Sequence, residues 1–260
     1  MTPDEFTSES TAAAWDEGAE AWNEFVESDA DFYRTEVHGP GLRHACGDVN
    51  DLRIFDVGCG QGWFSRQLAM GGALCVGVDI SSRHIKNARL HEARMPLGIE
   101  YHCLPVESIG EHLGDGDFDM VTACMSIQDM PNPNAAMQAI AGILGIGKSF
   151  VFSIPHPVTD SPYREWERNI GGEKGPLKID RYFESTPRTL DWNMPRLKYS
   201  WKTPYWGRTL AEWTTSVWEA GFVTKRLHEP RPTAEQVRRL PVLDDCYRLP
   251  YFLVFDCVRS

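Results

Sequence analysis

Acidic and glycine residues follow one another at two points where an apolar run ends. The segment DVGCGQG (56–62) has an acid two residues before the first of three glycines, and Asp79 closes the next apolar run. A glycine-rich turn lets the backbone come close to a ligand at the carboxyl edge of a parallel sheet, and a carboxylate there can accept hydrogen bonds from ribose hydroxyls. Either feature alone is a weak signal. Together they indicate a site for a nucleoside-containing cofactor.

The glycine spacing argues against a nicotinamide dinucleotide. A dinucleotide-binding turn has the pattern GxGxxG and holds a pyrophosphate on the helix that follows. Here the third glycine comes one residue early, and the bulky Trp63 occupies the position of the dinucleotide glycine. Asp56 would also repel a pyrophosphate. A carboxylate at that position suits a ligand that presents an amino group.

His156 is the leading candidate for a general base. It lies in the segment PHP (155–157), where the fifth expected strand ends, and the ordinary pKa of imidazole suits proton transfer near neutral pH. The alternative is a histidine that orients a loop or contacts substrate without taking a proton. The other histidines form no HExxH pattern and the seven cysteines form no CxxC pair. We therefore expect neither a metal site nor a disulfide framework.

Alternating strands and helices must position these residues. We expect strands over 52–57, 74–79, 99–103, 118–125 and 149–154, and helices over 63–70, 82–94 and 134–144. This order predicts a parallel sheet with helices on both faces. The alternation stops at Pro155. The proline- and aromatic-rich stretch that follows is expected to be irregular, with a hairpin-like part that contains Trp192, Tyr199 and Trp201. A helix over 209–220 and strands over 222–228 and 251–258 complete the chain.

An acidic N-terminal segment carries almost all of the net charge of −11. Residues 1–33 hold ten acids and no Lys or Arg, which leaves 27 of the 37 acids against all 26 basic residues in the rest of the chain. Within this segment, apolar residues recur at helical spacing, so we expect an amphipathic helix over 11–28, capped by Ser10 or Thr11. The charge argues against a nucleic-acid partner.

The same segment differs from a targeting sequence. A secretory signal begins with basic residues, and an organellar transit peptide is rich in arginine and poor in acids. No stretch approaches the roughly 18 apolar residues that a membrane span requires. We therefore expect a cytoplasmic protein without a membrane partner.

These motifs resemble those of the class I S-adenosylmethionine-dependent methyltransferases, in particular the small-molecule branch that includes ubiquinone and menaquinone-type enzymes. DFDMVTACMSIQDMPNP (117–133) and GKSFVFSIPHP (147–157) are similar to the fourth- and fifth-strand motifs of that branch, and RTLAEWTTSVWEAGF (208–222) is similar to its late helix. The resemblance covers residues 11–260 in element order. It implies an α/β fold with a Rossmann-like, doubly wound, seven-stranded and mostly parallel sheet, whose last strand is antiparallel.

The resemblance also implies one domain over residues 1–260. It would begin with an N-terminal lid over 11–45 and a cofactor-binding core over 46–155. An aromatic substrate cap, inserted after strand five, would cover 156–207, and a C-terminal helix with a strand pair would cover 208–260. The implied reaction is methyl transfer from S-adenosylmethionine to a small organic molecule by in-line displacement.

The resemblance implies a role for each residue of the cofactor site. Gly58, Gly60 and Gly62 would let the backbone approach the methionine and ribose portions of S-adenosylmethionine. Asp56 would face its amino group, and Asp79 its ribose hydroxyls. The remaining cofactor-binding candidates are Tyr33 at the carboxylate end, Cys59 within the glycine turn, Ile80 and Val106 on the adenine, and Met125 near the sulfonium. Pro105 stands where many relatives have an acid, which leaves Glu107 as a candidate for the adenine amino group.

The substrate candidates are mainly aromatic. Gln128 follows the fourth strand, Trp22 lies on the expected lid helix, and Trp192, Tyr199, Trp201 and Trp206 lie in the cap. Their rings could wall a substrate pocket. The alternative is that these rings pack the cap onto the sheet.

Three other functions remain as alternatives. A nucleic-acid methyltransferase is disfavoured by the charge and by the segment SIQD (126–129), which stands where a base-amino methyltransferase has a [DNS]PP[YFW] tetrad. A nicotinamide-dependent oxidoreductase is disfavoured by the glycine spacing. A non-catalytic S-adenosylmethionine-binding protein stays open. The expected partner is a small-molecule substrate, and the expected assembly is a monomer or a homodimer.

Overall fold

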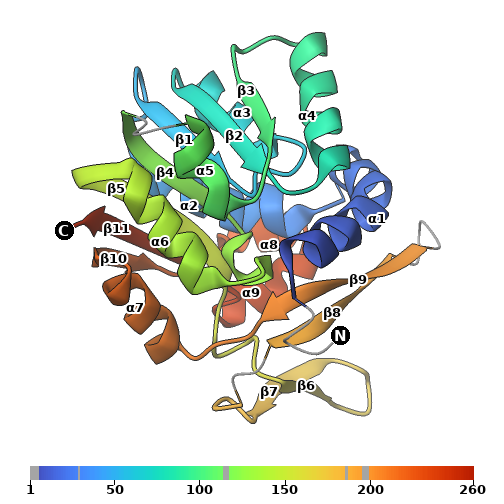
Figure 1. Ribbon diagram of the computed structural model, residues 1–260. Coiled ribbons are helices and arrows are strands. Elements are labelled where there is room, and N and C mark those ends of the chain that lie inside the picture. The colour runs from blue at the N-terminus through green and yellow to red at the C-terminus, as the bar shows by residue number, and fades with distance from the viewer. Residues whose placement is uncertain (1–5, 29, 114–116, 185–186, 195–198) are drawn as a thin grey trace.

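A seven-stranded sheet forms the centre of the computed structural model, which describes residues 6–28, 30–113, 117–184, 187–194 and 199–260 (Figure 1). In sheet order the strands are β10 (Phe222–His228), β11 (Phe252–Arg259), β5 (Leu144–Pro155), β4 (Phe118–Cys124), β1 (Arg53–Val57), β2 (Leu74–Asp79) and β3 (Glu100–Cys103). Strands β1 to β5 are parallel, whereas β11 is antiparallel to both of its neighbours. The predicted Rossmann-like sheet with an antiparallel last strand is confirmed.

Helices cover both faces because successive residues of the buried strands point to opposite sides. Ile54 belongs to a core shared with α2 (Gly39–Ala45), α3 (Trp63–Met70) and α4 (Ser82–Arg94). The next residue, Phe55, belongs to the second core, shared with α5 (Ile109–Leu113), α6 (Pro133–Ile143) and α7 (Leu210–Glu219). Two short helices, α8 (Ala234–Arg239) and α9 (Asp244–Arg248), lie between β10 and β11 in the chain.

The strand order reverses beside β1, which pairs with β2 on one side and β4 on the other. The chain therefore leaves the sheet in opposite directions after neighbouring strands, and a crevice opens at their carboxyl ends. Asp56 of β1 is in register with Gly77 of β2 and Thr122 of β4. This register brings the glycine turn, Asp79 and the end of β4 to one edge.

The expectation of an irregular stretch after Pro155 is wrong except for its hairpin-like part, which agrees with the second of two hairpins. The segment contains two antiparallel hairpins, β6 (Tyr163–Arg168) with β7 (Lys174–Asp180) and β8 (Pro187–Met194) with β9 (Tyr199–Trp206). Trp192 and Trp201 face each other across β8 and β9 and stack with ring centroids 5.6 Å apart. The many prolines obscured strands that cross-strand pairing stabilises.

The N-terminal helix α1 (Ser8–Glu27) begins earlier than expected. Thr7 is its N-cap and forms a capping box with Ser10, one of the two residues expected as the cap. The helix packs between α4 and strand β9, as Figure 1 shows. A short π-helical turn (Arg34–His38), which we did not predict, follows it and leads into α2.

Candidate cofactor and substrate site

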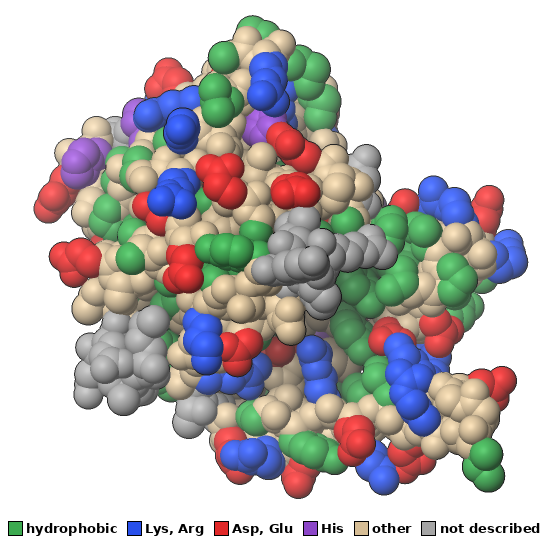
Figure 2. All heavy atoms as spheres, turned by 90° about the vertical axis from the view of Figure 1, so that its right-hand side faces the viewer, with side chains coloured by type: hydrophobic (Ala, Val, Ile, Leu, Met, Phe, Trp, Pro, Cys, Tyr) green, Lys and Arg blue, Asp and Glu red, His purple; other side chains and the backbone are tan. Residues whose placement is uncertain are grey.

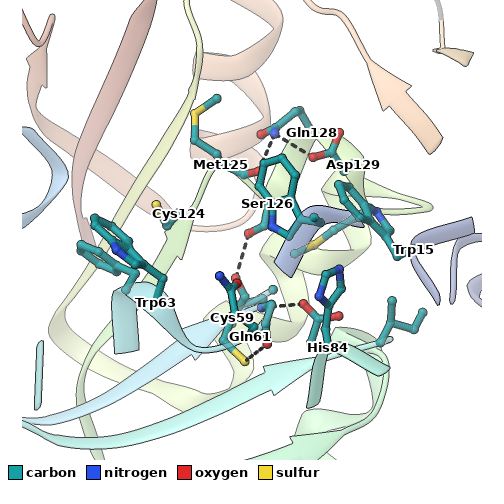
Figure 3. Close-up of a pocket in the computed structure, with 18 of the residues that line it drawn as sticks. Trp15, Cys59, Gln61, Trp63, His84, Cys124, Met125, Ser126, Gln128 and Asp129 are labelled. Atoms are coloured by element: carbon teal, nitrogen blue, oxygen red, sulfur yellow. Dashed lines mark hydrogen bonds between the residues drawn. The ribbon is translucent and has the colours of Figure 1, made fainter. Parts of the chain in front are cut away.

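A cavity of about 420 Å³ lies at the carboxyl edge of the sheet. Its wall comes from the ends of β1, β2 and β4, from α1 and the turn after it, and from the β8–β9 hairpin. The predicted site residues that line it are Trp22, Tyr33, Asp56, Gly58, Cys59, Gly60, Asp79, Ile80, Val106, Glu107, Met125, Gln128 and Trp192. Figure 3 shows Met125, Gln128 and Asp129 at one end of the residues drawn, and Cys59, Gln61 and His84 at the other.

The glycine turn leaves space that a side chain would fill. Gly58 and Gly60 both have left-handed backbones, with φ of 66° and 55°, which residues with a Cβ rarely adopt. A Cβ added at Gly60 would meet nothing within 4 Å, so glycine keeps this part of the cavity open. Gly62 lies outside the lining, and a Cβ there would stand 2.3 Å from the Tyr101 hydroxyl. The third glycine therefore serves packing.

Asp79 ties the glycine turn to the end of β2. One carboxylate oxygen accepts a hydrogen bond of 2.8 Å from the Gly60 N–H, and the other accepts one of 2.8 Å from the Ser81 N–H. Each oxygen retains a second lone pair. The carboxylate is thus fixed in place and can still accept hydrogen bonds from a ligand.

Asp56 is fully buried beneath the cavity. Its two oxygens accept hydrogen bonds from the hydroxyls of Ser65, at 2.6 Å, and Thr122, at 2.9 Å. Burial raises the pKa of Asp56 to about 6; the two hydroxyls oppose the rise, and the nearby Asp79 adds to it. A positively charged amino group nearby would favour the ionised form.

Met125 ends β4 in a strained conformation. Its φ is +53°, in the left-handed region that bulky residues other than glycine seldom occupy. Its N–H lies 3.1 Å from the Ser153 hydroxyl and 3.2 Å from the Ser153 carbonyl of β5, and both accept. Strain of this kind concentrates where a side chain must be aimed at a ligand.

Aromatic rings of α1 and the β8–β9 hairpin close the cavity. Trp192 lies 5.8 Å from Trp15 and 5.2 Å from Trp22, measured between ring centroids. Trp15 also lies 5.9 Å from the ring of His84 on α4. Asp16 joins α1 to the start of α4, because it accepts hydrogen bonds from the hydroxyls of Ser81 and Ser82 and from the Arg83 N–H.

The turn after α1 contributes a second group of lining residues. Arg34 is buried, with its guanidinium 4.8 Å from the centre of the Trp63 ring and 3.9 Å from the Asp31 carboxylate. Burial raises the pKa of Tyr33 to about 12, and burial together with Arg34 lowers that of His38 to about 3. His38 is therefore neutral at physiological pH.

Besides Gly62, four predicted residues lie outside the cavity lining. His156 lies with its Nε2 3.1 Å from Glu229, and its Nδ1 accepts from the Val158 N–H at 3.2 Å. Burial lowers its pKa, and Glu229 opposes the shift. Since both ring nitrogens have protein partners, this geometry fits the alternative of a loop-orienting histidine and not a base that faces the cavity.

The other three are aromatic residues of the cap. Tyr199 donates its hydroxyl proton to the Glu17 carbonyl. Trp201 is buried and packs so closely on Gly18 of α1 that no Cβ would fit there. Trp206 packs against Phe6. These rings hold the lid helix on the cap, which was the alternative left open by the sequence.

Sequence reasoning missed several buried lining residues that have unused hydrogen-bonding atoms, among them His84 and Asp129. In the described part of the chain, Nδ1 of His84 and Oδ1 of Asp129 have no hydrogen-bond partner. Burial lowers the pKa of His84, whereas it raises that of Asp129 well above the usual range. The sequence could have indicated these two residues only by their positions. His84 lies in the first turn of the helix that follows Asp79, and Asp129 is next to Gln128.

Two further features bear on function. Within the described ranges, no group of three or more His, Cys, Asp or Glu residues is arranged to hold a metal ion. No helix in these ranges is both long and apolar enough to cross a membrane.

Comparison with known proteins agrees with this geometry. A family described as a methyltransferase domain matches residues 55–152, the part that contains the glycine turn, Asp56, Asp79 and Met125. An S-adenosylmethionine-dependent methyltransferase from Mesorhizobium loti has a similar structure, with a TM-score of 0.71 and 28% identity over 85% of this chain and 96% of that chain. Residues 55–152 thus match a methyltransferase domain, and the chain is similar in structure to an S-adenosylmethionine-dependent methyltransferase.

Curated relatives of the methyltransferase domain include ubiquinone biosynthesis O-methyltransferases. That of Bordetella avium is 31% identical over 44% of this chain and 52% of its own length. That of Idiomarina loihiensis is 35% identical over 39% of this chain and 41% of its own length. The chain thus matches about half the length of these relatives or less.

The residues present fit the cofactor of this domain, S-adenosylmethionine. The space kept open at Gly60 and the fixed Asp79 carboxylate suit a ribose, and Ile80 and Val106 offer apolar surface for the adenine. Asp56 and Arg34 supply charges opposite to those of an amino acid moiety.

Proposed function

We propose that this protein transfers a methyl group from S-adenosylmethionine to a small organic molecule. The observation that carries the proposal is the Gly60–Asp79 contact at 2.8 Å, which fixes a ribose-binding carboxylate beside a glycine turn at the carboxyl edge of the sheet. Asp56 and Met125 line the same cavity. When bound, the cofactor supplies an electrophilic methyl group on a sulfonium.

The chain's own residues act by binding, orientation and exclusion of water. Asp79 would bind the ribose, and Arg34 with Tyr33 the carboxylate end of the cofactor. Trp15, Trp22 and Trp192 would cover the reacting groups, which holds them in line and keeps water away. His156 would orient the loop after β5.

Small size of the substrate is inferred from the closed cavity and its aromatic wall. On the face drawn in Figure 2, Lys and Arg side chains are interspersed with Asp and Glu, without a continuous basic surface for nucleic acid. We infer that the protein acts in the cytoplasm, as a monomer or a homodimer, without a nucleic-acid or membrane partner.

Calorimetry with S-adenosylhomocysteine and with NAD tests the cofactor assignment. We expect S-adenosylhomocysteine to bind at micromolar concentration and NAD not to bind; tight NAD binding would overturn the proposal. Radiolabelled S-adenosylmethionine with a panel of phenols, amines, carboxylates and quinones then tests transfer. A protein that binds the cofactor and labels no class in the panel would be a binding protein without catalysis.

A further inference from the structure

Gln128 and Asp129 form a polar end to an otherwise mainly apolar wall. The Gln128 amide donates to the Met125 carbonyl at 2.7 Å and to Asp129 Oδ2 at 2.9 Å. Asp129 is therefore tied to the end of β4, close to the strained Met125. Only 7% of Asp129 is exposed, and in the described part of the chain its Oδ1 has no hydrogen-bond partner. A buried acceptor without a donor is costly unless a ligand satisfies it.

The charges of the cavity wall leave Asp129 without a cationic partner. Among the described residues of the lining, Arg34 is the one Lys or Arg. It is engaged at the other side of the cavity by Asp31, the Val26 carbonyl and the Trp63 ring. Asp56 and Asp79 have hydroxyl or amide donors of their own. Asp129 is therefore the carboxyl group of the described lining that keeps a buried oxygen without a hydrogen-bond donor.

We propose that Asp129, positioned by Gln128, receives the nucleophilic N–H or O–H group of a substrate that is neutral or cationic, and accepts its proton. This inference rests on the proposed methyl transfer. An anionic substrate would meet a buried carboxylate and no free cation. An amine or alcohol would supply the missing donor, and the tryptophan wall suits a flat or cationic molecule.

The proton balance of the step is simple. The lone pair of the substrate nitrogen or oxygen forms the new bond to the methyl carbon as the carbon–sulfur bond breaks and its electron pair returns to sulfur. A neutral amine or alcohol gives its proton to the Asp129 carboxylate as the new bond forms, whereas an ammonium gives a proton to Asp129 first and so gains the lone pair that attacks. The proton later passes to solvent. No oxidant or metal is needed.

The surroundings of Asp129 make it a stronger proton acceptor than an ordinary carboxylate. Burial raises the pKa of Asp129, the Asp160 carboxylate adds to the rise, and the Gln128 amide opposes it. Tyr205 of β9 also lines the cavity and donates to Asp160, which pairs with Arg188 of β8 at 3.0 Å. Asp160, Tyr205 and Arg188 therefore act together with Gln128 on how ligand binding at Asp129 depends on pH.

Three ligands with one ring system test the substrate class. 2-Naphthylmethylamine, 2-naphthylmethanol and 2-naphthylacetate carry an ammonium, a hydroxyl and a carboxylate group. Their dissociation constants for the protein saturated with S-adenosylhomocysteine can be measured by calorimetry from pH 6 to pH 8. At pH 8 we expect the amine and the alcohol to bind at least roughly tenfold more tightly than the carboxylate, because one charge-assisted hydrogen bond changes affinity by about this factor. The preference should shrink as the pH falls through the raised pKa of Asp129, because the protonated carboxyl no longer repels the carboxylate ligand.

Two isosteric variants identify the responsible group. Asp129→Asn should abolish the pH-dependent part of the preference. His156→Asn should retain it, because His156 lies outside the cavity lining. Equal affinity for all three ligands, no binding of the amine and the alcohol, or an unchanged preference in Asp129→Asn would overturn the inference. Binding of S-adenosylhomocysteine is measured first and does not depend on how the three ligands rank. Failure of the proposed function is therefore distinguished from failure of this inference.

Discussion

The two ends of the cavity differ in how their carboxyl groups are satisfied. At the cofactor end, Asp79 accepts two backbone N–H groups and Asp56 accepts two hydroxyls. At the Gln128 end, Asp129 accepts one amide and keeps a buried oxygen without a partner in the described chain. Groups that hold an invariant ligand can be fixed by the fold itself, whereas a group that takes part in a reaction must keep bonding capacity for its ligand.

The largest expected effect is on the cofactor end. Asp79→Ala removes the acceptor of both the Gly60 and the Ser81 N–H. The glycine turn then loses the contact that fixes it, and the ribose loses the carboxylate that would bind it. We expect affinity for S-adenosylhomocysteine to fall by about 100-fold or more, as for the loss of two or more charged hydrogen bonds. Calorimetry measures the change.

Asp119 provides a matched control for this prediction. It also accepts a backbone N–H, from Arg53 at 3.0 Å, but it lies at the amino edge of the sheet. Asp119→Ala should leave affinity for S-adenosylhomocysteine unchanged. An equal loss in both variants would mean that general destabilisation, and not the Asp79 contact, sets the affinity.

Two glycines of the turn should separate binding from packing. Gly60→Ala places a methyl group in the cavity and strains a left-handed backbone, so we expect about tenfold weaker binding with about 1 kcal/mol lost from the free energy of unfolding. Gly62→Ala forces the Tyr101 hydroxyl away and should cost about 2–3 kcal/mol of stability with a smaller effect on binding. Denaturant unfolding and calorimetry give both quantities. The reverse ranking would show that Gly62, and not Gly60, borders the ligand.

The Gln128 end should show a cost in stability that grows with pH. The folded-state pKa of Asp129 lies above its unfolded value, so ionisation favours the unfolded chain as pH rises from the unfolded pKa through the folded one. Asp129→Asn removes this cost. We expect the melting temperature of this variant to match that of the wild type near pH 4 and to exceed it by about 2–4 °C at pH 8. This corresponds to a gain of roughly 1 kcal/mol in the free energy of unfolding.

Asp191 is the control, since it is exposed and pairs with Lys202 at 3.0 Å. Asp191→Asn should show no gain that grows with pH. A wild-type protein that is as stable as Asp129→Asn at every pH would contradict the contrast between the two ends of the cavity.

The smallest effect is expected where the lid helix meets the cofactor end. Asp16→Ala removes three hydrogen bonds to the start of α4, just beyond Asp79. The aromatic contacts of α1 remain, so affinity for S-adenosylhomocysteine should fall by only about three- to fivefold, with faster proteolysis within α1. Glu17→Ala, which removes an exposed neighbouring side chain, should leave both measurements unchanged.

Much of the cofactor end was predictable because its signals are local. The strand, the glycine turn, the helix and the next strand occupy 53–79, and their hydrogen bonds join residues close in sequence. The role of Gly62 was not predictable in this way. Its left-handed φ of 86° belongs to the turn, but the close contact with Tyr101 on β3 is imposed by strand pairing.

The substrate end was less predictable because its contacts join distant segments. Trp192 lines the cavity, whereas Trp201, its stacked partner on the next strand, packs against Gly18. Composition cannot tell two such tryptophans apart. The surroundings of His156 were not predictable for the same reason, since Glu229, which contacts its ring, is 73 residues away.

The sequence by itself determined the parallel sheet, the order of its elements and the edge at which a nucleoside would bind, because hydrophobic periodicity and turn chemistry are local properties of the chain. Only the tertiary structure decided which aromatic rings face the cavity, that both ring nitrogens of His156 are occupied, and that Asp129 retains a buried oxygen to offer. Each of these depends on which distant side chain comes to lie opposite, and that is fixed only when the lid and the hairpins pack against the sheet.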